Sequence, residues 1–234
     1  MSRVAIMQPY FLPYIGYFQL IKSVDVFVVY DNIEFSKKGW IHRNRLLLND
    51  EPRLFTLPLK KDSDYLPINQ RYLSTDFEIA QGKLLRLIAN AYHRAPYYEM
   101  VYPLVERILN FKNHNLFDFV HHSLIVLCEY LSISTKIVVS STLDIDHDLR
   151  FQDKVITICE HLHARTYLNS IGGKTLYDHQ SFLSHGIALH FLKSNALSYD
   201  QFGASFVPWL SIIDVMMFNS KEDIDVMLNA YELI

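Results

Sequence analysis

Residues 4–18 read VAIMQPYFLPYIGYF, and residues 25–31 read DVFVVYD. The first run opens with an apolar segment, is interrupted by Gln8-Pro9, and after Pro13 has the composition of a short helix that ends at Lys22. The second run is β-branched, aromatic and continuously hydrophobic, which is typical of a strand covered on both faces. Together the two runs predict a strand, a loop, a helix and a second strand, which form a βαβ unit with parallel strands.

The rest of the chain continues this alternation. A capping-box pattern at Thr75 opens a helical period that Pro96 ends. Further helices are predicted over 116–131, 151–163 and 211–219, and strands over 53–57, 136–140, 166–168 and 187–192. We therefore expect one α/β domain over residues 1–234, with a mostly parallel sheet flanked by helices. Residues 75–131 are expected to form a helical layer or lid over that sheet.

Composition, net charge and cysteine positions exclude several classes of protein. The chain has 234 residues, of which 50% are hydrophobic and 20% charged, so it is long and apolar enough for a core. Its net charge of −3 argues against a nucleic-acid partner. The two cysteines, Cys128 and Cys159, fall in apolar helical patterns, which indicates free thiols. No stretch resembles a signal peptide or a membrane span, so we expect a cytoplasmic protein without membrane insertion.

Ligands of open parallel sheets bind outside the carboxyl ends of the strands. This rule nominates four loops: 8–13, 31–45, 140–148 and 168–174. The second is the richest in chemistry, because Lys37, Lys38, Arg43 and Arg45 are able to hold an anionic group. In the same loop, Trp40 offers a face for stacking on a base or a sugar. The alternative is an ordinary solvated basic loop.

Two carboxylates are the acid–base candidates. Asp31 ends a buried strand, a position that suits a catalytic or ribose-binding carboxylate as well as a simple loop cap. Asp214 lies between Ile213 and Val215 in an apolar helix, so it needs a partner or a shifted pKa. An arginine is the partner we expect there.

Other chemical signatures are incomplete. Gly172-Gly173-Lys174 resembles the end of a phosphate-binding loop, but position 168 is Leu where that motif needs Gly. The backbone N–H groups of this turn are still able to hold an anion, unless it is an ordinary turn. The three aspartates of residues 144–148 lack the Gly and Glu that complete a calcium loop. We predict no metal site, and no nucleophile motif is present.

Four segments together match a known pattern. They are residues 4–18, residues 25–31 with Trp40 and residues 43–45, residues 167–177, and residues 199–214 through their YDQ and SIID motifs. On these segments the chain resembles the WbqC-like family of bacterial proteins, from its start to about residue 219. Many members carry His before Gln-Pro, whereas this chain has Met7, so a role for that histidine does not transfer.

The resemblance implies an enzyme of surface-polysaccharide (O-antigen) biosynthesis. The expected reaction is transfer of an acyl or aminoacyl group, glycyl included, to a nucleotide-linked amino sugar. The implied partners are that sugar and an activated donor, while cofactor and oligomeric state stay open. Asp31 is expected to act as the general base. The expected substrate-binding residues are Gln8, Tyr10, Lys37, Lys38, Trp40, Arg43, Asn44, Arg45, Gly172, Gly173, Lys174, Tyr177 and Gln201.

Two other functions are alternatives to the transferase. A nucleotidyltransferase with an HxGH motif would need histidines near Tyr14 and Tyr17, where there are none. A non-catalytic protein that binds a sugar nucleotide or a glycan for the assembly machinery is the main alternative, since the chain lacks a catalytic triad, a P-loop and a metal motif. Turnover separates it from the transferase.

Overall fold

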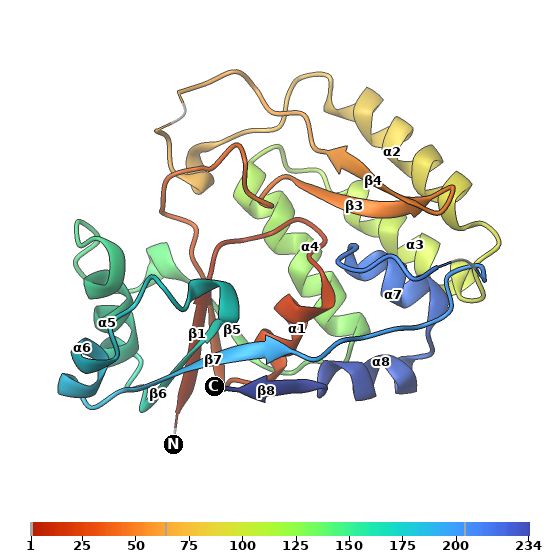
Figure 1. Ribbon diagram of the computed structural model, residues 1–234. Coiled ribbons are helices and arrows are strands. Elements are labelled where there is room, and N and C mark those ends of the chain that lie inside the picture. The colour runs from red at the N-terminus through yellow and green to blue at the C-terminus, as the bar shows by residue number, and fades with distance from the viewer. Residues whose placement is uncertain (1, 64, 204) are drawn as a thin grey trace.

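A six-stranded sheet forms the centre of the protein in a computed structural model that describes residues 2–63, 65–203 and 205–234 (Figure 1). Its strands are β1 (Arg3–Met7), β2 (Val26–Val29), β5 (Lys136–Val139), β6 (Thr166–Ser170), β7 (Ala188–Ser194) and β8 (Tyr231–Leu233). They lie in the order β5-β2-β1-β6-β7-β8, and every neighbouring pair is parallel except β7 with β8. The predicted α/β fold with a mostly parallel sheet is therefore confirmed.

Helices cover both faces of this sheet. The side chains of β1 alternate between two cores: Val4 and Ile6 belong to one and Ala5 to the other. The core around Val4 is closed by α5 (Phe151–His161) and α6 (His179–Ser184). The larger core around Ala5 is closed by α1 (Ile15–Lys22), α4 (Leu116–Tyr130), α7 (Ile212–Phe218) and α8 (Lys221–Leu228).

The chain changes direction across the sheet beside β1. Strands β2 and β5 follow β1 on one side, and β6, β7 and β8 extend the sheet on the other. The chain leaves β1 for α1 on one face and leaves β6 for α6 on the opposite face. This is the strand order of doubly wound nucleotide-binding folds, in which ligands bind at the reversal point. The ends of β1 and β6 are thus the expected ligand-binding edge.

A second sheet contradicts the prediction that residues 43–45 lie in a loop. Strands β3 (Arg43–Leu48) and β4 (Glu51–Thr56) form an antiparallel hairpin outside the main sheet. Residues 43–45 were expected in a loop, yet they lie on β3. The turn residues Asn49 and Asp50 have φ of 52° and 61°, as a two-residue hairpin turn requires. Asn and Asp tolerate this backbone region well. The Asn49-Asp50 pair is therefore a sequence signal for a hairpin turn, which the prediction of a single loop over 31–45 did not use.

Residues 77–130 supply a helical layer, as predicted. It contains α2 (Phe77–Tyr92), α3 (Tyr98–Leu109) and α4, which share the larger core with the hairpin (Figure 1). Helix α3 was missed because its interior holds Pro103, a residue that usually ends helices. The capping box at Thr75 is wrong: Asp76 is the N-cap of α2, and its side chain makes no capping bond with any described residue.

Short 3-10 turns follow three strands or loops of the chain. They are η1 (Ile68–Gln70), η2 (Ser140–Thr142) and η3 (Ile171–Gly173), and the last two begin directly after β5 and β6. Across the described ranges, no helix has both the length and the apolar character needed to cross a membrane.

Candidate functional site

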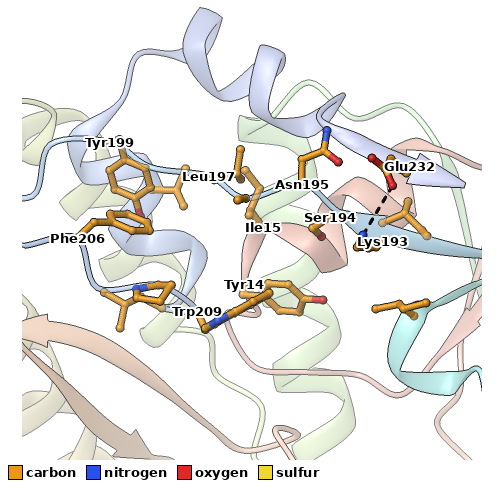
Figure 2. A pocket seen from close by; sticks show the side chains of 16 residues that line it. Tyr14, Ile15, Lys193, Ser194, Asn195, Leu197, Tyr199, Phe206, Trp209 and Glu232 are labelled. Carbon is orange, nitrogen blue, oxygen red and sulfur yellow. Dashed lines mark ion pairs between the residues drawn. The ribbon is translucent and has the colours of Figure 1, made fainter.

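Two adjoining cavities lie where the loops after β1 and β7 approach the hairpin. The small chamber has a volume of about 210 Å³ and is lined by Tyr10, Pro13, Tyr14, Trp40, Asn44, Arg45 and Trp209. The large chamber has a volume of about 880 Å³ (Figure 2). Its lining is formed by Tyr14, Ile15, Ile171, residues 192–197, Tyr199, Phe206, residues 208–210, Val215 and Glu232. Tyr14 and Trp209 line both chambers, so we treat the two as one cleft.

Trp40 and two arginines form the cationic side of the cleft. The guanidinium carbons of Arg43 and Arg45 lie 5.7 and 5.3 Å from the centre of the Trp40 ring. Arg43 also donates to the carbonyl groups of Lys38 and Gly39 and so fixes the loop before β3. Arg45 donates to the Trp209 carbonyl at 3.3 Å, while its buried Nε contacts no acceptor in the described residues. Arg45 lines the small chamber and Arg43 does not, so Arg45 is the arginine in position to contact a ligand there.

The loop after β1 is tied to the hairpin by Asn44. The amide of Asn44 donates to the carbonyls of Phe11 and Leu12, at 3.2 and 2.7 Å, and accepts from the N–H of Arg45. Leu12 has a φ of 48°, which is strained for a branched residue, and its carbonyl also accepts from the Ser211 hydroxyl. Asn44 was predicted to orient substrate hydroxyls. Instead its amide shapes the loop that carries Tyr10 and Tyr14.

Gly16 makes room for Tyr14. A Cβ atom at Gly16 would lie 2.3 Å from Cε2 of Tyr14 and 2.7 Å from the Ser194 hydroxyl, so no other residue fits without displacing them. Burial raises the pKa of Tyr14, and a hydrogen bond with Ser194 opposes this rise. A glycine at position 16 is thus a packing requirement of the cleft wall.

The large chamber has an apolar end and a polar end. Figure 2 shows Tyr199 and Phe206 at one end, and Ser194, Asn195, Lys193 and Glu232 at the other. Lys193 and Glu232 face each other across the β7–β8 pair, with Nζ and Oε2 3.8 Å apart and both side chains more than half exposed. This pair places an ammonium and a carboxylate at the mouth of an otherwise largely apolar cavity.

Asp31 is buried rather than open to a substrate. It is 1% exposed, and its carboxylate accepts from the Ser140 hydroxyl at 2.8 Å, the Ser141 N–H at 2.9 Å and the Asn69 amide at 2.8 Å. It lines neither chamber. These bonds join the ends of β2 and β5 to η1, so the loop-cap interpretation describes Asp31 and the open general base does not.

Asp214 is fully buried, and its partners are not arginines as expected. Its carboxylate accepts from the hydroxyls of Tyr92 and Tyr199, at 2.8 and 2.7 Å, and from the Gln201 amide at 2.6 Å. Burial raises the pKa of Asp214, and these three donors oppose the rise. Gln201, which is 1% exposed, is fully engaged with Asp214 and the backbone of Val207, so it supports the wall of the large chamber through Tyr199 rather than contacting its contents.

The diglycine turn, residues 172–173, packs against the end of β6 and does not line the cleft. Ile171, just before this turn, reaches the large chamber, while Gly172, Gly173 and Lys174 line neither cavity. A Cβ atom at Gly173 would lie 2.8 Å from Oδ1 of Asn169, which explains the glycine. The Asn169 amide donates to the hydroxyls of Tyr167 and Tyr177, so Tyr177 belongs to the core on the α5–α6 side.

The structure therefore brings together only part of the predicted site. Tyr10, Trp40, Asn44 and Arg45 meet in the small chamber. Gln8, Lys37, Lys38 and Arg43 line neither chamber, although Arg43 stacks on Trp40 from outside. The backbone carbonyl of Gln8 accepts from the Tyr17 hydroxyl at 2.8 Å.

The sequence patterns did not predict several residues that line the cleft. Tyr14, Lys193, Trp209 and Glu232 line it but were not predicted. One signal was available: the connection after β7, residues 195–211, is unusually long, and long connections at strand ends are often functional. Among the described residues, no group of three or more metal-binding side chains comes together, so no metal centre is assigned there.

Comparisons with known proteins identify the family and one relative. The profile of the WbqC-like protein family matches residues 8–226. The chain is similar to the uncharacterized protein Rv1507c of Mycobacterium tuberculosis, with 27% identity over 222 residues that cover 94% of each chain. No solved structure matches significantly.

Proposed function

This chain belongs to the WbqC-like protein family, and from that premise we propose that it transfers an acyl or aminoacyl group to the amine of a nucleotide-linked amino sugar. The product would serve surface polysaccharide such as O-antigen. The observation that carries the proposal is the joined two-chambered cleft beside the direction reversal of the sheet, where doubly wound folds bind nucleotides. Fold alone does not define a reaction, so the argument depends on the residues of the cleft.

The small chamber suits the nucleotide. Arg45 offers a planar fork to a diphosphate, and Trp40, Tyr10 and Trp209 offer aromatic faces to a base or sugar ring. The large chamber then receives the reacting amine and the donor. Because Tyr14 and Trp209 are in edge-to-face contact and line both chambers, a ligand that spans the chambers lies across these two rings.

Each bond and proton of the proposed reaction is accounted for by the substrates and by a side chain of the cleft. The neutral amine attacks the donor carbonyl carbon, a C–N bond forms, and the bond from that carbon to the leaving thiolate or phosphate breaks. The amine proton needs an acceptor. Of the carboxylates considered, Asp31 and Asp214 are buried, whereas Glu232 lines the large chamber. We assign the proton-acceptor role to Glu232 in place of Asp31.

The proposal places the protein in the cytoplasm, with sugar nucleotide and activated donor as its partners. The free, buried thiols of Cys128 and Cys159 are consistent with a reducing compartment. The alternative, a binding protein without turnover, is favoured by one observation: both buried carboxylates are fully engaged in hydrogen bonds that hold the fold.

One assay tests the transferase and separates the two functions. The purified protein is incubated with a panel of nucleotide-linked amino sugars, each paired with acyl thioesters, aminoacyl thioesters, or glycine with ATP, and products are read by mass spectrometry. The expected result is an acyl mass gain on one sugar. Saturable binding of a sugar without any mass gain would support the binding protein, and no binding at all would refute both.

A further inference from the structure

The large chamber is built for an amphiphilic guest. Ile15, Leu197, Phe206 and Val215 line its apolar part, and the charged pair Lys193–Glu232 lies at its mouth (Figure 2). Its volume of about 880 Å³ is at the upper end of ordinary ligand sites, far more than a glycyl group fills. A wholly polar ligand would lose its hydration against these apolar walls without gaining hydrogen bonds from them.

We infer that the large chamber holds the acyl chain of the donor, and that this chain is apolar and several carbons long. This inference rests on the proposed function, whose donor it specifies. The chain packs between Leu197 and Phe206, and the carbonyl end lies toward Ser194 and Glu232, where the charged and polar side chains are. A donor oriented in this way presents its carbonyl carbon on the side where Glu232 accepts the amine proton.

Trp209 supports the same orientation. Its backbone has a φ of 60°, the residue is 62% exposed, and it lines both the large and the small chamber. A large aromatic side chain left this open at the junction of two cavities gains buried contact area when an apolar chain occupies the chamber. The strained backbone is consistent with a functional constraint on the ring position.

The chain's two tryptophans make the test direct. Trp40 and Trp209 are its only tryptophans, and both line the cleft, so intrinsic fluorescence reports on occupancy there. The probes are S-acyl-N-acetylcysteamine thioesters with acyl chains of two, four, six, eight and ten carbons. We expect the Kd to fall about fourfold for each added methylene until the chamber is full. A Kd that does not change with chain length would overturn the inference.

Two variants locate the binding site. Leu197→Asp places a charge in the apolar part of the chamber and should abolish the dependence on chain length. Leu176→Asp is the matched control, because Leu176 is 69% exposed and lines neither chamber, and it should keep that dependence. Circular dichroism melts of both variants identify any loss of folding. A folded Leu197→Asp variant that retains the full chain-length dependence would also overturn the inference.

The outcomes separate this inference from the proposed function. Flat thioester binding together with sugar-nucleotide binding and glycyl transfer would refute the apolar donor and support the transferase. Chain-length dependence without any binding or modification of a sugar nucleotide would support the acyl site and refute the sugar acceptor.

Discussion

The rings of Tyr14 and Trp209 meet edge to face, with centroids 5.7 Å apart and planes at 62°. Tyr14 precedes α1, and Trp209 lies in the connection before α7, so this contact joins two distant parts of the chain at the junction of both chambers. Edge-to-face packing is a favoured aromatic geometry and adds stability beyond area burial. The contact therefore fixes the position of the two residues that line both chambers.

Replacing Trp209 should weaken ligand binding. Trp209→Ala removes a stacking face from the small chamber, and we expect sugar-nucleotide binding to lose about 1–3 kcal/mol. Trp209→Phe keeps an aromatic face and should recover part of the loss. Calorimetric titration measures both variants. Equal affinity in the wild type and Trp209→Ala would show that the ring does not contact the ligand.

Arg45 should contribute through its charge and its fork. Arg45→Ala is expected to weaken sugar-nucleotide binding by about 1.5–3 kcal/mol, the range of a charge-assisted hydrogen bond. Arg45→Lys keeps the charge but loses the planar donor pair, so its effect should be intermediate. Arg53→Ala is the matched control, because Arg53 is exposed on the neighbouring strand β4. Unchanged calorimetric affinity in Arg45→Ala would remove Arg45 from the site.

The Asp31→Asn substitution distinguishes a structural role of the Asp31 carboxylate from a catalytic one. An amide at this position directs N–H groups at one of the three donors that now bind the carboxylate, so we expect a loss of about 1–3 kcal/mol of unfolding free energy. Urea unfolding measures this, with Asp50→Asn in the exposed hairpin turn as control. If transfer activity instead fell a hundredfold or more at unchanged stability, Asp31 would be the general base after all.

Glu232→Gln should remove the proton acceptor while keeping the shape of the chamber. We expect kcat to fall about 10²–10⁴-fold, with KM for the sugar nearly unchanged. Glu222→Gln on the exposed surface of α8 is the control. A Glu232→Gln enzyme with wild-type kcat would assign the role elsewhere.

His42 should make the fold sensitive to acid. Burial, with Arg43 and Arg71 nearby, lowers the pKa of His42 from 6.5 to about 4. The folded protein then binds fewer protons than the unfolded chain between these values, so stability is complete above pH 6.5 and falls as the pH drops toward 4. We expect a loss on the order of 1–2 kcal/mol, allowing for the partial exposure of the ring.

Urea midpoints at pH 7 and pH 4.5 measure this loss. His42→Gln removes one titrating group with a strongly lowered pKa and should reduce the change between the two pH values. His161→Gln, at an exposed histidine, should retain it. A wild-type chain equally stable at both pH values would contradict the prediction.

Local patterns in the sequence were enough to predict the α/β class and the edge of the sheet near which the cleft lies. Residues 4–18 and 25–31 specify a strand, loop, helix and strand because hydrophobic continuity and Pro positions act locally, and parallel strands place their following loops on one edge. Tyr10, Trp40 and Arg45 were found in this way, since Tyr10 follows β1 in the chain and Trp40 and Arg45 lie in the segment 31–45 that follows β2.

Which side chains are free to contact a ligand depends on long-range packing. Asp31, Asn44 and Gln201 look reactive in the sequence, but their hydrogen-bond partners come from segments far along the chain and bury them. Glu232 enters the cleft because β8 pairs with β7 at the end of the sheet, a long-range pairing that local patterns do not encode. Burial and partner choice are properties of the packed chain, and they separate the residues that hold the cleft from those that face a ligand.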